Sequence, residues 1–268
     1  MHTSKLILLA SLLITSVSIL SLNMDSGAKA QQVSPFVSQV QFEEWKETLS
    51  NWGRWGPDDE IGTLNLVTQE KRKEAASLVQ TGITVSLARD TDNIESVDNP
   101  CPVEWEMVNA TPNGASDRIA FRCIHGLGTT HIDGFGHRFF DGKMWNGVDM
   151  EETVTMEEGA KVNSVLTMKD GVVTRGVLYD IPRLKGVDYL EPGYRVTVED
   201  LEAWEAMAGV SVGPGDAMLF RWGRWARRDN EGPFDTWEEA AGLDNSCLLY
   251  TSDAADEGLG VDLGGRRI

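Results

Sequence analysis

The sequence predicts a mixed α/β domain, because segments that carry helix caps alternate along the chain with segments rich in β-branched and aromatic residues. Thr197 and Asp200 form a capping box, and Gly209 marks the end of the helix that this box begins. The clearest strands cover residues 176–181 and 217–222, and a Gly-Pro-Gly-Asp turn leads into the second of them. This order of strand, helix and strand favours the α/β class.

The N-terminal half predicts a less regular series of elements. Apolar residues at helical spacing indicate a first helix, and Thr68 can cap a second one. Glycine and proline break a tryptophan-rich segment, and three prolines interrupt a long polar one. In chain order we expect a helix over 42–51, a loop over 52–57, a helix over 68–80, a strand over 83–87, an irregular excursion over 90–116 and a strand over 117–125.

The first thirty residues resemble a secretory signal peptide. Lys5 precedes the apolar run 6–22, and Ala28 and Ala30 offer a small-residue cleavage site before Gln31. An uncleaved membrane anchor is the alternative, because the apolar run is long. We therefore expect a secreted or periplasmic protein with no membrane contact after signal cleavage, and a single domain over residues 31–246.

The last residues, 247–268, have an unusual composition. They read Cys-Leu-Leu-Tyr-Thr-Ser-Asp-Ala-Ala-Asp-Glu and continue into a glycine-rich stretch. This stretch resembles a translated sequencing adapter, because codons that encode it reproduce the two constant parts of a transposase-based library adapter. We interpret residues 247–268 as an artefactual tail, and we expect the domain to be C-terminally truncated near Ser246. A natural acidic and glycine-rich tail is the alternative.

The chain is strongly acidic, with 24 lysine and arginine residues against 42 aspartate and glutamate residues. Such a chain repels phosphate backbones, which argues against nucleic acid as a partner. Cys101 and Cys123 lie in the body of the domain, and an oxidising compartment would permit a bridge between them. Two separate buried thiols are the alternative, because the sequence does not show how closely the two residues approach.

The residues that carry chemistry lie in one short segment. Apart from His2, the histidines are His125, His131 and His137, and Asp133 stands among them. In an extended chain His131 and Asp133 project to the same face, about 6.5 Å apart along it. Glycines at 126, 128, 134 and 136 allow the backbone to bend and bring the outer histidines to the same point. Imidazole and carboxylate groups suit Zn²⁺, Mn²⁺ or Fe²⁺.

The segment Thr130-His131-Ile-Asp133-Gly-Phe-Gly-His137 resembles the metal motif of the cyclase family, which includes bacterial kynurenine formamidase and isatin hydrolase. That motif reads His-x-Gly-Thr-His-x-Asp-x-Pro-x-His. The resemblance implies that His131 and Asp133 bind the metal, Zn²⁺ or Mn²⁺, and that His137 is the catalytic acid and base. The first family histidine falls on Leu127, so His125 would replace it through a bulge, and a glycine or phenylalanine replaces the proline.

Flanking segments extend the resemblance over residues 41–246, in a longer branch of the family. They cover residues 55–65, 141–147, 174–180 and 214–216. The family implies a single swivelling β/β/α domain, assembly as a homo-oligomer when full length, and a metal site completed by a downstream histidine and glutamate. The chain has no histidine after His137, which the expected truncation explains.

The function implied is hydrolysis of an amide or related carbonyl in a small molecule, of the kind that arylformamidases of tryptophan catabolism perform, by a water molecule that the metal activates. Trp52 and Trp55 are candidates for an aromatic wall that binds an aryl substrate, or they pack against their own core. Asp141 and Asn146 either shape the rim of the pocket or are ordinary turn residues. Two other functions stay open: a secreted non-catalytic binding protein with a degenerate metal site, and an Fe(II) oxygenase, whose facial triad also begins His-x-Asp.

Overall fold

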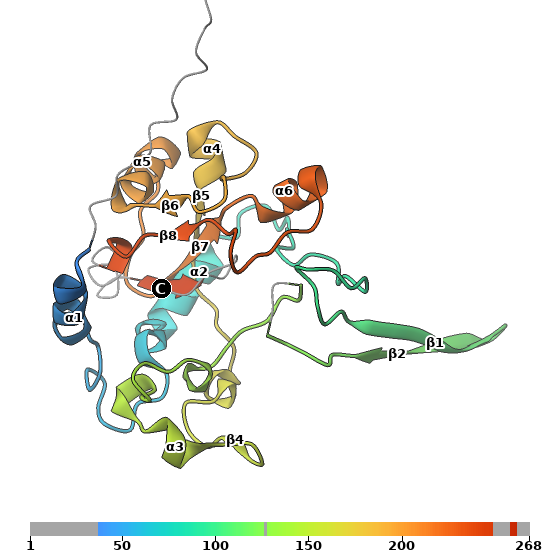
Figure 1. Cartoon of the computed structure of the whole chain (residues 1–268), viewed down its shortest axis with the longest axis horizontal. Helices are drawn as coiled ribbons and strands as arrows, with labels where there is room; N and C mark the ends of the chain where they lie inside the picture. Colours follow the sequence, from blue (N-terminus) through green and yellow to red (C-terminus); the bar gives the residue numbers. More distant parts are fainter. Residues whose placement is uncertain (1–36, 126–127, 249–257, 262–268) are drawn as a thin grey trace, which may run out of the picture. The chain divides into compact units, whose positions relative to one another are not determined.

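The computed structural model describes residues 37–125 and 128–248, together with the backbone of residues 258–261 (Figure 1). The α-helices are α1 (Gln39–Thr48), α2 (Gln69–Ser77), α3 (Met150–Thr153), α4 (Ile181–Lys185), α5 (Val198–Ala208) and α6 (Arg224–Glu231). Four short 3-10 helices are η1 (Gly62–Leu66), η2 (Phe135–His137), η3 (Trp145–Gly147) and η4 (Val165–Met168). The strands are β1 (Glu104–Thr111), β2 (Gly114–Ala120), β3 (Val154–Thr155), β4 (Gly159–Ala160), β5 (Gly176–Asp180), β6 (Arg195–Val196), β7 (Asp216–Arg221), β8 (Gly242–Leu243) and β9 (Gly258–Val261).

The expected signal peptide lies outside these residues, as does the expected tail apart from residues 247–248 and the backbone of β9. Within the described part of the chain, no helix has the length and apolar character needed to cross a membrane.

A parallel sheet in the order β5-β7-β9 carries the main hydrophobic core. Gly176 of β5 pairs with Ala217 of β7, and the register continues to Asp180 and Arg221. Buried residues alternate along both strands, as expected for strands with one face on a core. The core residues are Val177, Tyr179, Ile181, Leu190, Val196, Leu201, Trp204, Met218, Phe220, Trp222, Ala241 and Cys247.

Helix α5 covers one face of this sheet and is fixed to β5 by polar contacts. The indole Nε1 of Trp204 donates a hydrogen bond to the carbonyl of Leu178 at 2.6 Å. The hydroxyl of Tyr179 donates to Glu205 at 2.6 Å. Figure 1 shows α5 and α4 together beside β5 and β6. Because these two polar groups have partners, the rings of Trp204 and Tyr179 can pack in the core without loss of hydrogen bonds.

The predicted strands 176–181 and 217–222 are confirmed as β5 and β7, with ends shifted by at most one residue, and the predicted helix between them is α5. Both bonds of the Thr197 capping box are present, and Gly209 ends the helix with a left-handed φ of 67°. The mixed helix and strand content of the prediction is confirmed as well. The helices α4 and α6 were not predicted, because each is short and follows directly on a strand.

Both N-terminal helices are present with shifted ends. Helix α1 begins at Gln39 because the Oγ of Ser38 caps it, accepting a hydrogen bond from the backbone N–H of Gln41. The predicted cap Thr68 is confirmed, since its Oγ1 accepts from the N–H of Lys71 at 3.2 Å. Helix α2 ends at Ser77, so the predicted extension to residue 80 is wrong by three residues.

Three predictions for residues 83–125 need correction. Residues 83–87 form no strand in the described structure, and Ile83 and Val85 are 79% and 77% exposed. An extended segment becomes a strand only where a neighbour satisfies its backbone groups. The expected excursion 90–116 contains β1, which pairs with β2 as an antiparallel hairpin, so Pro112 lies in a hairpin turn. The predicted strand 117–125 ends at Ala120.

Asp216 joins three parts of the fold at the start of β7. Its side chain is completely buried and accepts from Arg175 at 2.9 Å and from the backbone of Gly213 at 2.9 Å. Lys71 of α2 lies 2.7 Å from its second oxygen. A buried carboxylate is stable only with such partners. The neighbouring Gly215 has a φ of 76°, and a Cβ there would stand 2.5 Å from the carbonyl oxygen of Leu66.

A second buried carboxylate, Asp98, fixes the segment before the hairpin to helix α6. Its side chain is 1% exposed and accepts from Arg228 Nε at 2.7 Å, with Arg224 at 3.4 Å. Burial alone would raise the pKa of Asp98, but hydrogen bonds from Ser96 and Arg228 and the charges of both arginines hold it below its ordinary value. Asp98 is therefore charged in the folded protein.

We expect Asp98→Asn to lower the free energy of unfolding at pH 7 by about 3–5 kcal/mol, because it removes the buried anion that pairs with Arg224 and Arg228. A depressed carboxyl pKa stabilises the fold above its unfolded value, and this contribution is lost as pH falls through the lower, folded value. Urea unfolding between pH 3 and 7 should therefore show a smaller loss of stability in acid for the variant. Asp229→Asn on the same helix, whose exposed side chain pairs with Arg89, is the control. Parallel pH curves for wild type and Asp98→Asn would contradict the role of Asp98.

Candidate metal centre

The backbone between Asp133 and His137 lies directly against residues 160–165. The N–H of Gly136 donates to the carbonyl of Asn163 at 2.7 Å. A Cβ on Gly134 would stand 2.5 Å from the backbone N of Val165, and one on Gly136 would stand 2.8 Å from the Cβ of Ala160. Gly134 has an ordinary φ of −84°. These glycines are thus required for close approach of two backbones rather than for the bending that the sequence predicts.

Three imidazole rings surround the carboxylate of Asp133. His125 Nδ1 lies 3.0 Å and His131 Nε2 3.6 Å from its Oδ1, and His137 Nε2 lies 3.6 Å from its Oδ2. One donor atom each from His125, Asp133 and His137 lies within 4.8 Å of the others. His131, which the sequence predicts as a ligand, is not in this group, and its Nε2 lies 3.6 Å from the Oδ1 of Asp133.

The tautomer of His131 is set by its backbone contact. Its Nδ1 lies 2.8 Å from the carbonyl oxygen of Thr129, which has no proton to donate. Nδ1 must therefore carry the proton, and the lone pair is on Nε2, the atom nearest to Asp133. A hydrogen bond of this kind is the usual outer contact of a metal-binding histidine. The donor set of imidazole nitrogens and a carboxylate fits Zn²⁺ or Mn²⁺.

His137 is held in η2 and stacks on His125. Their ring centroids are 3.8 Å apart and the planes differ by 14°. Burial lowers the pKa of His137, Asp133 opposes this, and the neighbouring His125 lowers the pKa further, so that the net shift is downward. His137 is thus neutral near pH 7, and a neutral imidazole can either bind a cation or accept a proton.

Contacts distinguish the two candidate substrate residues. Trp55 is half-buried and lies 6.2 Å from Trp145, whose ring stacks on Phe135 at 5.1 Å. This row of rings ends within the metal segment. Trp52 is 47% exposed and packs over Gly147. Sequence reasoning missed Phe135 and Trp145, which connect the tryptophan loop to the segment 125–137. The presence of aromatic residues in both segments is only a weak signal for such a contact.

The turn residue Asn146 holds the tryptophan loop in place. With a left-handed φ of 60°, it accepts from the N–H of Gly53 at 2.7 Å and donates to the carbonyls of Gly56 and Asp59. Asp141 also has a left-handed backbone, and its exposed side chain contacts Lys46 at 3.3 Å. Asn146 is therefore a structural residue of this loop, and Asp141 lies in an exposed turn.

We expect Gly134→Ala to destabilise the protein by about 1–3 kcal/mol, because the new methyl group would overlap the backbone of Val165. The free energy of unfolding in urea measures this. Gly114→Ala, in the hairpin turn where a Cβ meets nothing within 4 Å, is the matched control. The close-approach role fails if the two substitutions have equal effects.

Comparisons with known proteins point to one family. The Cyclase family model matches residues 67–265. A crystal structure described as that of a novel cyclase has a TM-score of 0.65 and 28% sequence identity, covering 78% of this chain and 74% of that chain. The comparison with curated proteins gave no match. The family match includes most of residues 247–268, so their origin in an adapter stays a prediction, which the nucleotide sequence of the gene decides.

The matched region contains the whole His125 to His137 segment, the sheet β5-β7-β9 and helix α5, and it spans well over half of the sequence. The chain therefore belongs to the cyclase family.

Proposed function

We propose that the protein is a metal-dependent hydrolase that cleaves an amide or a related carbonyl compound, in the manner of an arylformamidase. The observation that carries the proposal is the convergence of three imidazole rings on the carboxylate of Asp133. Membership of the cyclase family supports it further. The contacts among the described residues give no separate support to a non-catalytic binding protein or to an Fe(II) oxygenase.

His131, Asp133 and His125 would hold the cation. When bound, Zn²⁺ or Mn²⁺ supplies a Lewis acid that activates water and polarises a carbonyl group. The Thr129 carbonyl keeps His131 in the tautomer needed for this, with its lone pair on Nε2. The three ligands come from one short segment, and two of its glycines contact the backbone of residues 160–165.

His137 would move the proton. Its lowered pKa keeps one ring nitrogen free to accept a proton from water near neutral pH and to return it to the leaving nitrogen. The neighbouring His125 lowers the pKa of His137 further, which helps the proton to leave again. Trp55 and, more exposed, Trp52 remain the proposed aromatic contacts of an aryl substrate.

We also propose that the site is completed by residues that this sequence does not contain. His125 and Asp133 are 53% and 37% exposed, which leaves the centre open to water. The expected downstream histidine is missing, since His137 is the last histidine of the chain. Export to an oxidising compartment belongs to the same proposal, and the disulfide between Cys101 and Cys123 supports it. A small-molecule substrate and self-association of the full-length protein stay predictions.

The hydrolase proposal predicts that the gene product continued beyond residue 246 hydrolyses an N-formyl arylamine, and that a chelator abolishes the reaction until Zn²⁺ or Mn²⁺ is returned. His137→Ala should lower the turnover rate by about 10²–10⁴-fold while metal content is retained, because it removes the proton carrier and leaves the ligands. Metal analysis and steady-state rates measure the two effects. Asp229→Asn, far along α6, is the surface control. Loss of metal together with activity would instead make His137 a ligand, and rates indifferent to chelation would refute the proposal.

For the incomplete site, we expect residues 31–268 to bind Zn²⁺ more weakly than the continued gene product and to show negligible turnover. A metal ion held by fewer protein ligands is released more readily. This chain keeps Cys247 in the core and β9 beside β7. Competition against a chromophoric chelator measures both affinities under one set of conditions. Full-rate hydrolysis by residues 31–268 is the outcome that would disprove this proposal.

A further inference from the structure

The chain contacts a second loop both before and after His125. This second loop, residues 92–103, leads into the hairpin and is called the anchor loop. Cys123, just before His125, is bonded to Cys101 of the anchor loop, with a Cα–Cα separation of 5.9 Å. Gly128, just after His125, lies so close to Asn99 that a Cβ would stand 2.7 Å from the amide oxygen of Asn99. The anchor loop thus brackets this one imidazole.

The anchor loop is itself fixed to the body of the domain. The Nδ2 of Asn99 donates to the carbonyls of Asp92 and Ile94, at 3.1 and 2.9 Å. Asp98 is buried against Arg224 and Arg228 of α6, and Asp92 also lies 3.0 Å from Arg228. A covalent bond to Cys101 therefore connects the His125 segment to a helix of the main domain.

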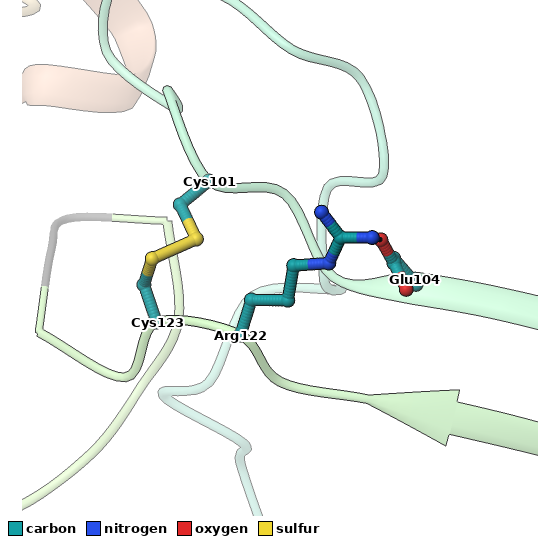
Figure 2. Close-up of a disulfide and its surroundings, with 4 residues drawn as sticks. All are labelled: Cys101, Glu104, Arg122 and Cys123. Atoms are coloured by element: carbon teal, nitrogen blue, oxygen red, sulfur yellow. Dashed lines mark ion pairs between the residues drawn. A yellow bond between two sulfur atoms is a disulfide. The ribbon is translucent and has the colours of Figure 1, made fainter.

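His125 needs such a connection more than the other two histidines do. Its side chain is 53% exposed, against 18% for His131 and 23% for His137. The hairpin before it offers little support, because all but one residue of β1 and β2 are exposed. Figure 2 shows the disulfide at the base of this hairpin, beside the exposed ion pair between Arg122 and Glu104. An exposed ion pair holds a segment only weakly.

We propose that the Cys101–Cys123 disulfide is a positioning element of the metal centre, which holds His125 beside Asp133 and His137 and thereby raises metal affinity. The metal part of this inference rests on the proposed function, whereas the placement of His125 does not. In this inference the two cysteines touch neither substrate nor cation, and they act through His125 alone. Their effect on metal affinity should therefore disappear when His125 is removed.

The first experiment needs no metal. In the full chain, the ring proton signals of His125 and His137 should carry ring-current shifts from their 3.8 Å stacking. Replacing both cysteines, Cys101→Ser with Cys123→Ser, should move these signals towards the positions of a freely exposed histidine. The signals of Tyr179 and Trp204 report whether the core stays folded. Unchanged histidine shifts in a variant with an intact core would overturn the proposal.

The second experiment measures Zn²⁺ affinity by competition with a chromophoric chelator. The double serine variant should bind Zn²⁺ about 10–100-fold more weakly, the range seen when outer contacts of a ligand are removed. In a His125→Ala background the same change should alter affinity by no more than about twofold, the usual error of additivity. A full further loss in that background would show a general structural effect and refute positioning through His125.

Two further variants keep the test decisive. Glu104→Gln breaks the ion pair next to the disulfide and should leave both readouts unchanged. If the double serine variant does not fold, Asn99→Ala loosens the anchor loop with the disulfide intact and should shift the His125 signals in the same direction. If even the wild-type chain binds no Zn²⁺, the metal proposal fails for this chain, and the histidine signals still decide the placement of His125.

Discussion

The attraction between the Asp133 carboxylate and the imidazoles around it is the interaction on which the candidate site depends. All three rings lie within 3.6 Å of one of its oxygens, measured from the nearest nitrogen. A divalent cation at this point would satisfy the carboxylate and imidazole nitrogen lone pairs together. Burial lowers the pKa of His137, and the neighbouring His125 lowers it further against the opposing charge of Asp133.

Two groups of contacts hold the segment that contains His125, Asp133 and His137. On one side the glycines at 134 and 136 let the chain lie against residues 160–165, and on the other the disulfide and Asn99 connect it to the anchor loop. Neither support comes from the large hydrophobic core around β5 and β7. Held by backbone contacts, a covalent bridge and buried ion pairs, this segment keeps its shape although His125 and Asp133 are exposed.

The sequence predicts the parts of this structure whose signals are local. The capping box at Thr197, the cap at Thr68 and the turn before Asp216 each specify an element through contacts within a few residues, and each is present. The clustering of the histidines with Asp133 was visible for the same reason. The segment 83–87 has the residue pattern of a strand, but pairing depends on a neighbour that local sequence does not reveal.

The contacts that hold the candidate site could not be predicted from local sequence, because they join distant positions in the chain. The contact of Asp98 with Arg228, the closure of Cys101 on Cys123 and the row from Trp55 through Trp145 to Phe135 each link segments far apart in the chain. Spacing allowed the disulfide but did not require it. The close approach of Gly134 to Val165 was likewise hidden, since a glycine in a motif indicates freedom of the backbone without naming what will fill the space.

Side chains that are often covered in folded proteins are exposed at two separate places in the described structure. His125 and Asp133 are open to water, and the apolar side chains of Ile83 and Val85 are mostly exposed although their alternation is that of a half-buried strand. Isolated exposed apolar residues are ordinary, but a strand-like row of them is usually covered. Exclusion of water from the site would strengthen the charge interactions around Asp133. In the described residues the three imidazoles already lie close to this carboxylate, while His125 and Asp133 stay exposed to water.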